Sequence, residues 1–172
     1  MPSGTSETST SRHILAPFCA GLGLDIGFGR DKVVPHAISF DMPTPYTCVG
    51  GDEQIMRGDC RDLRMFCDES LDYIYSSHLL EDFTYEQLIP LIGEWRRVLK
   101  VGGRVVTNCP DQQRFLSHCA ATGQGLNLAH KEANFSLQTF KDTVLAHTGP
   151  WEVQHETPEH GPYSWLLVVA KA

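Results

Sequence analysis

Residues 23–31 read GLDIGFGRD, an apolar run that reaches an acid and then turns through glycines. Such a segment predicts a short buried strand and a tight turn, because glycine adopts backbone conformations that other residues avoid. The turn lets a ligand approach the backbone closely, and a helix that follows would offer free N–H groups. Alone, this is a weak indication. It is strengthened by three segments at suitable distances, namely Asp41, residues 58–63 (GDCRDL) and residues 95–106 (WRRVLKVGGRVV).

Strand and helix patterns alternate along most of the chain. Short runs of β-forming residues bounded by turns predict strands at 22–26, 36–41, 54–58, 71–76 and 104–109. A capping box of Thr84 and Gln87 begins a helix that ends near Gly102, a second helix is expected at 136–147, and 110–135 has no regular pattern. Residues 151–156 and 163–170 follow each other without a helix and should pair antiparallel. The chain therefore predicts an α/β fold, Rossmann-like and doubly wound. Its mostly parallel sheet forms a three-layer sandwich with a C-terminal antiparallel hairpin.

Length and composition limit the class of protein. The 172 residues suffice for one domain, expected at 13–172 after a small, polar and disordered tail at 1–12. A net charge of -7 argues against a general nucleic-acid binder, which would carry a basic face. The six cysteines form no CxxC pair and indicate free thiols in a reducing compartment. Without an apolar span or a secretory signal, we expect a cytoplasmic protein with no membrane or nucleic-acid partner.

Polar residues should gather at one edge of the predicted sheet. In open α/β sheets, ligands bind at the carboxyl ends of the strands, where the strand order switches. Five positions that are distant in the chain are expected to meet there: Gly27, Asp41, Asp59, Ser77 and Asp111. Packing alone does not readily explain such a convergence, so this edge is the candidate site.

The residues at this edge favour a ligand with a cationic centre and a ribose over a dinucleotide. A dinucleotide fingerprint needs a glycine where Lys32 stands, and Asp25 would lie badly beside a pyrophosphate. No GxxxxGK[ST] segment is present, which excludes a P-loop. Asp25 can face a positive group directly or through water, Asp41 can accept both ribose hydroxyls, and Asp59 can accept from an adenine amino group. S-adenosylmethionine carries all three of these groups.

Two longer blocks resemble class I S-adenosylmethionine-dependent methyltransferases, in particular the small bacterial type 11 domains. They are LRMFCDESLDYIYSSHLLEDF at 63–83 and EWRRVLKVGGRVVTNCPD at 94–111, within a resemblance that covers about residues 20–170. It implies that the methionine part lies near the first motif and the end of the fourth strand, and that the ribose and adenine lie near the second and third. The implied cofactor residues are Asp25, Gly27, Phe28, Gly29, Asp41, Met42, Asp59, Cys60, Ser76 and Ser77.

The chain departs from the family pattern in places that bear on the site. Asp31 stands at the third glycine of the family's turn, and the stretch from Asp41 to Asp59 is rich in proline and glycine, which leaves one crossover little helix. Only about 20 residues precede the first strand, too few for the helices that often cover the cofactor. The site is therefore open, or it is covered by residues 111–135 or by a second subunit of a homodimer.

Methyl transfer requires alignment of the acceptor and, where the acceptor must lose a proton, a base. His78 is the first candidate base and Asp111 the second, although helix capping would also explain His78. Candidate substrate residues lie in the irregular segment, namely Gln112, Arg114, His130 and Lys131, and for His130 a loop-anchoring hydrogen bond is an alternative. A metal at His155 and His160 is not favoured, and we expect no metal site.

The sequence thus favours S-adenosylmethionine-dependent methyl transfer to a small-molecule or saccharide-type acceptor. The stretch SSHLLED lacks the [DN]PPY pattern of enzymes that methylate amino groups, which weakens a DNA-base or glutamine target. One alternative is a non-catalytic module, or a subunit of a larger complex, that binds S-adenosylmethionine or S-adenosylhomocysteine. A nicotinamide-dependent oxidoreductase and aminopropyl transfer are further, less favoured alternatives.

Overall fold

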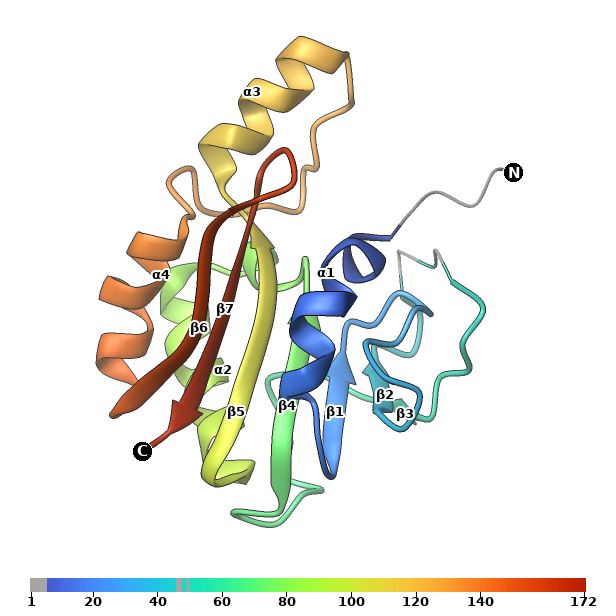
Figure 1. The fold of residues 1–172 in the computed structure, drawn as a ribbon, viewed down its shortest axis with the longest axis vertical. Helices are drawn as coiled ribbons and strands as arrows, with labels where there is room; N and C mark the ends of the chain where they lie inside the picture. Colours follow the sequence, from blue (N-terminus) through green and yellow to red (C-terminus); the bar gives the residue numbers. More distant parts are fainter. Residues whose placement is uncertain (1–5, 46–47, 49) are drawn as a thin grey trace.

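A seven-stranded sheet forms the centre of the protein, with the order β3-β2-β1-β4-β5-β7-β6 (Figure 1). The computed structural model describes residues 6–45, 48 and 50–172. The strands are β1 (Gly23–Ile26), β2 (Ile38–Asp41), β3 (Met56–Arg57), β4 (Leu71–Ser77), β5 (Leu99–Pro110), β6 (Trp151–His160) and β7 (Ser164–Lys171). Strands β1 to β5 pair in parallel, whereas β7 pairs antiparallel with β5 and β6. The predicted mostly parallel α/β sheet with a C-terminal hairpin is confirmed.

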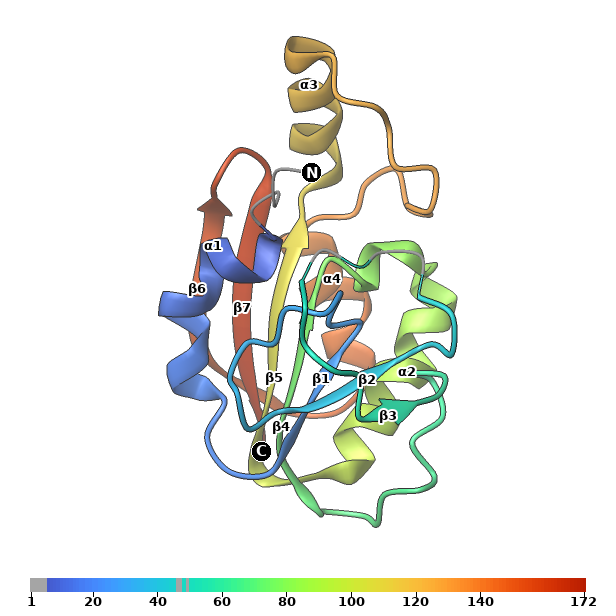
Figure 2. The ribbon, with the colours of Figure 1, turned by 90° about the vertical axis from the view of Figure 1, so that its right-hand side faces the viewer.

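Helices cover both faces of this sheet, as a three-layer sandwich requires (Figure 2). Helix α1 (Glu7–Leu15) lies on one face, while α2 (Tyr85–Val98) and α4 (Leu137–Thr143) lie on the other. Helix α3 (Gln112–Thr122) extends beyond the carboxyl ends of the parallel strands. Short 3-10 turns follow α1, β4 and α4: η1 (Ala16–Phe18), η2 (Leu80–Asp82) and η3 (Leu145–His147). No helix in the described part of the chain is long and apolar enough to cross a membrane.

The α2 side holds the larger part of the core. The helix begins at the predicted capping box, in which Thr84 and Gln87 satisfy each other's backbone N–H groups. One stripe of α2 is fully buried against the sheet, and it comprises Leu88, Leu91, Ile92, Trp95 and Val98. Burying each such side chain contributes roughly 1.5–3 kcal/mol. The indole of Trp95 also donates a 2.9 Å hydrogen bond to the carbonyl of Cys60, which fixes the loop after β3.

The opposite face is covered by α1, which corrects the prediction of a disordered tail through residue 12. Ser6 caps the helix by accepting from the N–H of Ser9 at 2.9 Å, and Leu15 is buried against the sheet. Asp31 receives hydrogen bonds from Ser6 and Arg12, which fasten α1 to the glycine-rich turn. A helix of nine residues is unstable on its own. Because α1 also contains few apolar residues, its sequence is similar to that of a disordered tail. Residues 1–5 lie outside the described residues.

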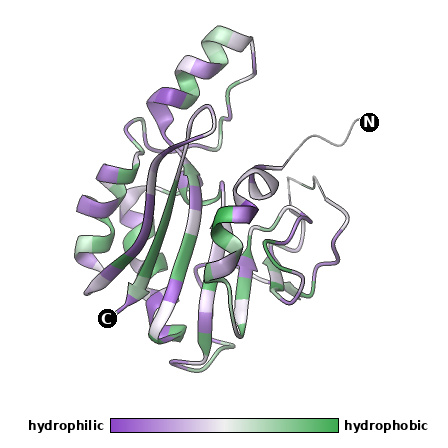
Figure 3. Cartoon of the chain, viewed as in Figure 1, coloured by the Kyte–Doolittle hydropathy of each residue, from purple (hydrophilic) through white to green (hydrophobic). Residues whose placement is uncertain are grey.

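The segment 110–135 is more regular than predicted. Asp111 caps α3, and Gly123, with φ +75°, ends it in the left-handed conformation. The helical pattern is weak because α3 buries only Gln112, Phe115 and Cys119, and its other residues are partly or fully exposed. By contrast, β7 is hydrophobic along most of its length, whereas the edge strand β6 is largely hydrophilic (Figure 3).

The connections on the β1–β3 side are mostly loops. No helix lies in 27–37, between β1 and β2, nor among the described residues between β2 and β3. This agrees with the predicted loss of helix between Asp41 and Asp59. The carboxyl ends of β1 and β2 are therefore framed by loops.

Candidate active site

A cavity of about 730 Å³ opens at the carboxyl ends of β1, β2 and β4. Strands β1, β2 and β3 are added in turn toward one edge of the sheet, whereas β4 and β5 are added toward the other edge. The direction therefore switches between β1 and β4. The cavity therefore lies where the strand order switches, as open α/β sheets predict. Its volume falls within the roughly 300–1,000 Å³ that is typical of small-molecule sites.

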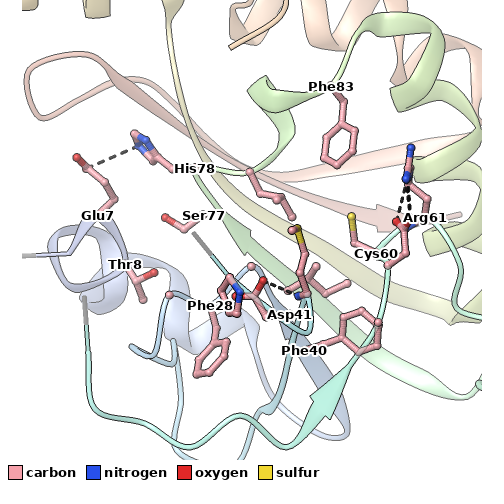
Figure 4. A pocket seen from close by; sticks show the side chains of 18 of the residues that line it. Glu7, Thr8, Phe28, Phe40, Asp41, Cys60, Arg61, Ser77, His78 and Phe83 are labelled. Atoms are coloured by element: carbon pink, nitrogen blue, oxygen red, sulfur yellow. Dashed lines mark hydrogen bonds and ion pairs between the residues drawn. The ribbon is translucent and has the colours of Figure 1, made fainter. Parts of the chain in front are cut away.

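Most of the predicted cofactor residues meet at this cavity (Figure 4). Those that line it are Gly27, Phe28, Gly29, Asp41, Met42, Asp59, Cys60 and Ser77. Asp25 and Ser76 do not line it, because both are fully buried within β1 and β4. The backbone fold thus brings together segments that are up to 50 positions apart (27 and 77) in the sequence.

The glycine-rich turn has the conformation that its sequence requires. Gly27 and Gly29 have φ angles of +67° and +54°, in the left-handed region that favours glycine. The N–H of Gly27 donates to the carbonyl of Phe40 at 2.9 Å and so joins the turn to β2. A Cβ on Gly27 would lie 3.2 Å from the side chain of Leu79. A side chain here would therefore displace a wall of the cavity.

Asp25 is fully buried beneath the glycine-rich turn and holds the chain after it by a backbone hydrogen bond. This position does not favour the direct contact with a cationic ligand that the sequence predicts. One of its carboxyl oxygens, Oδ2, accepts from the N–H of Val33 at 2.6 Å, and Oδ1 has no hydrogen-bond partner among the described residues. Burial raises the pKa of Asp25 to about 8, opposed by the hydrogen bond from Val33. The protonated form therefore predominates at neutral pH. The sequence predicts that Asp25 lies near the end of a strand, as observed, but it does not predict that the side chain is fully buried.

Asp41 ends β2 and lies at the cavity, half-buried. Its Oδ1 accepts from the N–H of Met42 at 2.7 Å. Burial raises the pKa of Asp41, while hydrogen bonds from the backbones of Met42 and Gly29 lower it. A carboxylate has about four acceptor positions, so two backbone bonds leave capacity for a diol.

The loop after β3 adds an ion pair that sequence reasoning missed. Arg61 donates to both carboxylate oxygens of Asp59, with Nη2 to Oδ2 at 2.6 Å and Nε to Oδ1 at 2.9 Å, and this lowers the pKa of Asp59. The same guanidinium lies 6.0 Å from the ring centroid of Phe83. Burial raises the pKa of Cys60 to about 12, so its thiol is neutral and forms a wall of the cavity.

His78 follows β4 in a strained backbone conformation, with φ +51°. Its N–H donates to the carbonyl of Asn108 at 2.8 Å, and its Nε2 lies 3.1 Å from Oγ of Ser164. Burial lowers the pKa of His78 to about 4, although the nearby Glu7 carboxylate acts in the opposite direction. The imidazole is thus neutral at pH 7 and has one nitrogen able to accept a proton. Beside it, Oγ of Ser77 is buried at the cavity without a partner among the described residues.

Asp111 and the four predicted substrate residues do not line this cavity. The carboxylate of Asp111 accepts from the N–H groups of Gln113 and Arg114 at 3.1 and 3.0 Å. These contacts give Asp111 a structural role, and they do not favour its predicted role as a catalytic group, which stays a prediction. Strand β5 continues to Pro110 and α3 begins directly after it, so the acid satisfies the first N–H groups of the helix.

The remaining predicted residues make structural contacts around α3. Arg114 donates to the carbonyls of Gly161 and Pro162 and lies at a separate, shallow hollow of about 400 Å³. Nδ1 of His130 and Oε1 of Gln112 are 2.7 Å apart, which agrees with the loop-anchoring alternative. Lys131 is exposed, and its N–H donates to the carbonyl of Glu81.

The N-terminal helix and the segment after α3 also contribute to the lining of the cavity. Residues that sequence reasoning missed include Ser6, Glu7 and Thr8 of the α1 terminus, together with Arg61, Phe83 and Asn127. Asn127 belongs to the segment 111–135 that was considered as a cover, whereas the N-terminal residues were assigned to a tail. The one available signal for α1 was Ser6, a favourable cap, ahead of Glu7 in the first turn.

Comparison with known proteins agrees with this geometry. Residues 24–107 match the family model of a methyltransferase domain. A search of curated proteins finds no match. Among solved structures, an S-adenosylmethionine-dependent methyltransferase from Archaeoglobus fulgidus has a TM-score of 0.71 at 17% identity, covering 95% of this chain and 92% of that one.

Two further structures have the same fold. A protein from Pyrococcus horikoshii OT3 has a TM-score of 0.71 at 17% identity and covers 95% of this chain and 88% of its own. An S-adenosylmethionine-dependent methyltransferase from Mesorhizobium loti has a TM-score of 0.63 at 13% identity, covering 96% and 98%. At such identities the likeness establishes the fold. Residues 24–107 thus match a methyltransferase domain, and the chain as a whole has the fold of solved S-adenosylmethionine-dependent methyltransferases.

Proposed function

We propose that this protein transfers the methyl group of S-adenosylmethionine to a small-molecule or saccharide-type acceptor. The observation that carries the proposal is the cavity at the switch in strand order, which is lined by both the glycine-rich turn and Asp41. Glycines that admit a ligand to the backbone, an acid at the end of β2 and the unpartnered Ser77 hydroxyl all fit this cofactor.

Each part of the cofactor has a matching group in the cavity. Asp41 would accept the ribose hydroxyls, and Met42, which is 46% exposed, would pack on the adenine. Cys60 and Asp59 would flank the other side of the adenine. Gly27, Phe28 and Ser77 would surround the methionine part, and this leaves His78 next to the methyl group.

The bound cofactor supplies an electrophilic methyl on a sulfonium, whose leaving group is neutral. The chain then has to align an acceptor atom within roughly 3–3.5 Å of that carbon and exclude water. Residues of the α1 terminus and Asn127 also line the cavity. A concave site of about 730 Å³ favours a small acceptor, or the end of a saccharide, over a folded macromolecule.

Calorimetry of the purified protein with S-adenosylmethionine and S-adenosylhomocysteine tests the cofactor assignment. The wild type should bind both, and Asp41→Ala should lose roughly 1.5–3 kcal/mol, the scale of hydrogen bonds to a charged group. Glu159→Ala, an exposed acid on the edge strand β6, is the matched control and should bind like the wild type. Absence of binding to the wild type would overturn the proposal.

Turnover is tested separately, by release of S-adenosylhomocysteine with phenol, 4-hydroxybenzoate and methyl glucoside as acceptors. Release above the rate without acceptor would support a transferase and indicate its acceptor class. Tight binding without release on these or a wider set of acceptors would instead favour the non-catalytic module.

A further inference from the structure

Glu7 and His78 come from distant parts of the chain and lie side by side at the cavity (Figure 4). Glu7 is the first residue of α1, and His78 directly follows β4. Oε2 of Glu7 lies 3.7 Å from Nε2 of His78. Both residues line the cavity, so an acceptor bound there would lie next to a carboxylate–imidazole pair.

Neighbouring groups hold this pair in place. The hydroxyl of Tyr163 donates to Oε1 of Glu7 at 2.9 Å, and the ring of Tyr163 meets that of His78 edge-on at 6.0 Å. The side-chain amide of Asn108 donates to the carbonyl of Glu7 at 3.2 Å. The first bond restrains the carboxylate and the second restrains the backbone of Glu7, so the acid needs little reorganisation when a charge forms on the imidazole.

Three further groups that titrate or hydrogen-bond face His78 from other elements. In η2, Oε1 of Glu81 lies 3.6 Å from Nδ1 of His78, and Glu81 is only 1% exposed. In the loop after α3, Nε2 of His130 lies 3.9 Å from the same Glu81 oxygen. At the start of β7, Oγ of Ser164 lies 3.1 Å from Nε2 of His78. Burial raises the pKa of Glu81 well above its usual range and lowers that of His130. Burial therefore disfavours the charged form of Glu81, whereas the side chain of Glu7 is 34% exposed, so Glu7 is the acid that can stabilise a charged His78.

We propose that Glu7 is a positioning residue that enables His78 to take the proton of a hydroxyl acceptor. The inference rests on the proposed methyl transfer and narrows its acceptor to an alcohol or phenol. A thiolate or carboxylate acceptor carries no proton to remove and would not need this pair.

The proposed step conserves atoms and charge. A lone pair of the acceptor oxygen forms the new bond to the methyl carbon as the carbon–sulfur bond breaks, and the electrons of that bond remain on sulfur. The hydroxyl proton passes to a ring nitrogen of His78, which becomes imidazolium. The Glu7 carboxylate stabilises the imidazolium, and the proton is later released to water.

The coupling can be measured by NMR titration of the histidine rings in the presence of S-adenosylhomocysteine. The His78 signals are assigned by their loss in His78→Ala. In Glu7→Gln the titration midpoint of His78 should move to lower pH than in the wild type, because the charge that favours imidazolium is gone. Glu86→Gln removes an exposed acid from the first turn of α2 and should leave the midpoint unchanged. An unchanged midpoint in Glu7→Gln would overturn the proposal.

Turnover of the hydroxyl compounds named above gives a second readout. His78→Ala should lower kcat by roughly 10²-fold or more, the usual contribution of a base. Glu7→Gln should lower kcat less and shift the acidic limb of its pH profile to lower pH. Both variants should bind S-adenosylhomocysteine like the wild type. Failure of the wild type to bind it would contradict the proposed function, whereas normal binding and a normal pH profile in Glu7→Gln would contradict only the role of Glu7.

Discussion

Nη2 of Arg61 lies 2.6 Å from Oδ2 of Asp59, so the acid that was expected to meet the adenine is paired with a neighbour two residues away. Both side chains are about half exposed, at 51% and 47%. Water screens such a pair, and its contribution to stability should be about 0–1 kcal/mol. A double-mutant cycle of Arg61→Ala and Asp59→Ala by urea unfolding measures this coupling. A value well above that range would indicate that the pair holds the loop after β3 in place.

The buried Asp25 should make stability depend on pH. Its folded pKa of about 8 lies above the ordinary 3.8, so the folded state holds a proton that the unfolded state releases between these values. The contribution of this proton to the stability of the folded state is complete below about pH 4 and is lost as pH rises toward 8. Over that range the free energy of unfolding falls by up to about 1.4 kcal/mol per pH unit. Asp25→Asn stays neutral and should lack this dependence. We therefore expect the stability of the ligand-free wild type, measured relative to Asp25→Asn, to fall between pH 5 and pH 8. A constant difference between the two proteins would contradict the assignment.

Gly27→Ala should damage both the backbone and the cavity. A left-handed φ costs an alanine about 1–2 kcal/mol, and the new Cβ would meet Leu79. Gly102→Ala is the matched control, because its φ is +75° while no atom lies within 4 Å of its added Cβ. Thermal unfolding should show a loss of stability in both variants, because both need a left-handed φ. The loss should be larger for Gly27→Ala, because its Cβ also meets Leu79. Calorimetry with S-adenosylhomocysteine should show weaker binding for Gly27→Ala alone.

Asp31 stands where the methyltransferase family usually has a glycine, and Asp31→Gly tests whether its side chain holds α1 in place. The change restores the family residue but removes the acceptor for Ser6 and Arg12. We expect faster tryptic cleavage after Arg12 and weaker binding of S-adenosylhomocysteine, since α1 would detach from the cavity. Arg12→Lys keeps a charge on α1 but loses the fork of the guanidinium, so its binding loss should be smaller. Unchanged binding in Asp31→Gly would mean that α1 is held in place by its apolar contacts.

The sequence predicts the sheet well because its strands are apolar, short and bounded by turns, as residues 71–76 show. It also predicts the cavity edge, since Asp41 and Ser77 each end a strand and Gly27 directly follows one. It does not predict α1 or α3, because their narrow apolar faces give weak periodicity and their caps, Ser6 and Asp111, are too weak a signal alone. Glu7 was missed for the same reason, because its role depends on a contact with His78, 71 positions away.

In the described part of the chain, strands β1, β2 and β3 are joined by loops, and this has a consequence for local unfolding of the protein. Its strands span four, four and two residues, whereas β4, β5, β6 and β7 span seven, twelve, ten and eight. Short strands joined by loops unfold locally at a lower free energy than long paired ones. The amides of Ile38–Asp41 should therefore exchange with solvent before those of β5 and β7. Because the methyl donor would bind only the closed form, its concentration would set how often this half of the sheet opens.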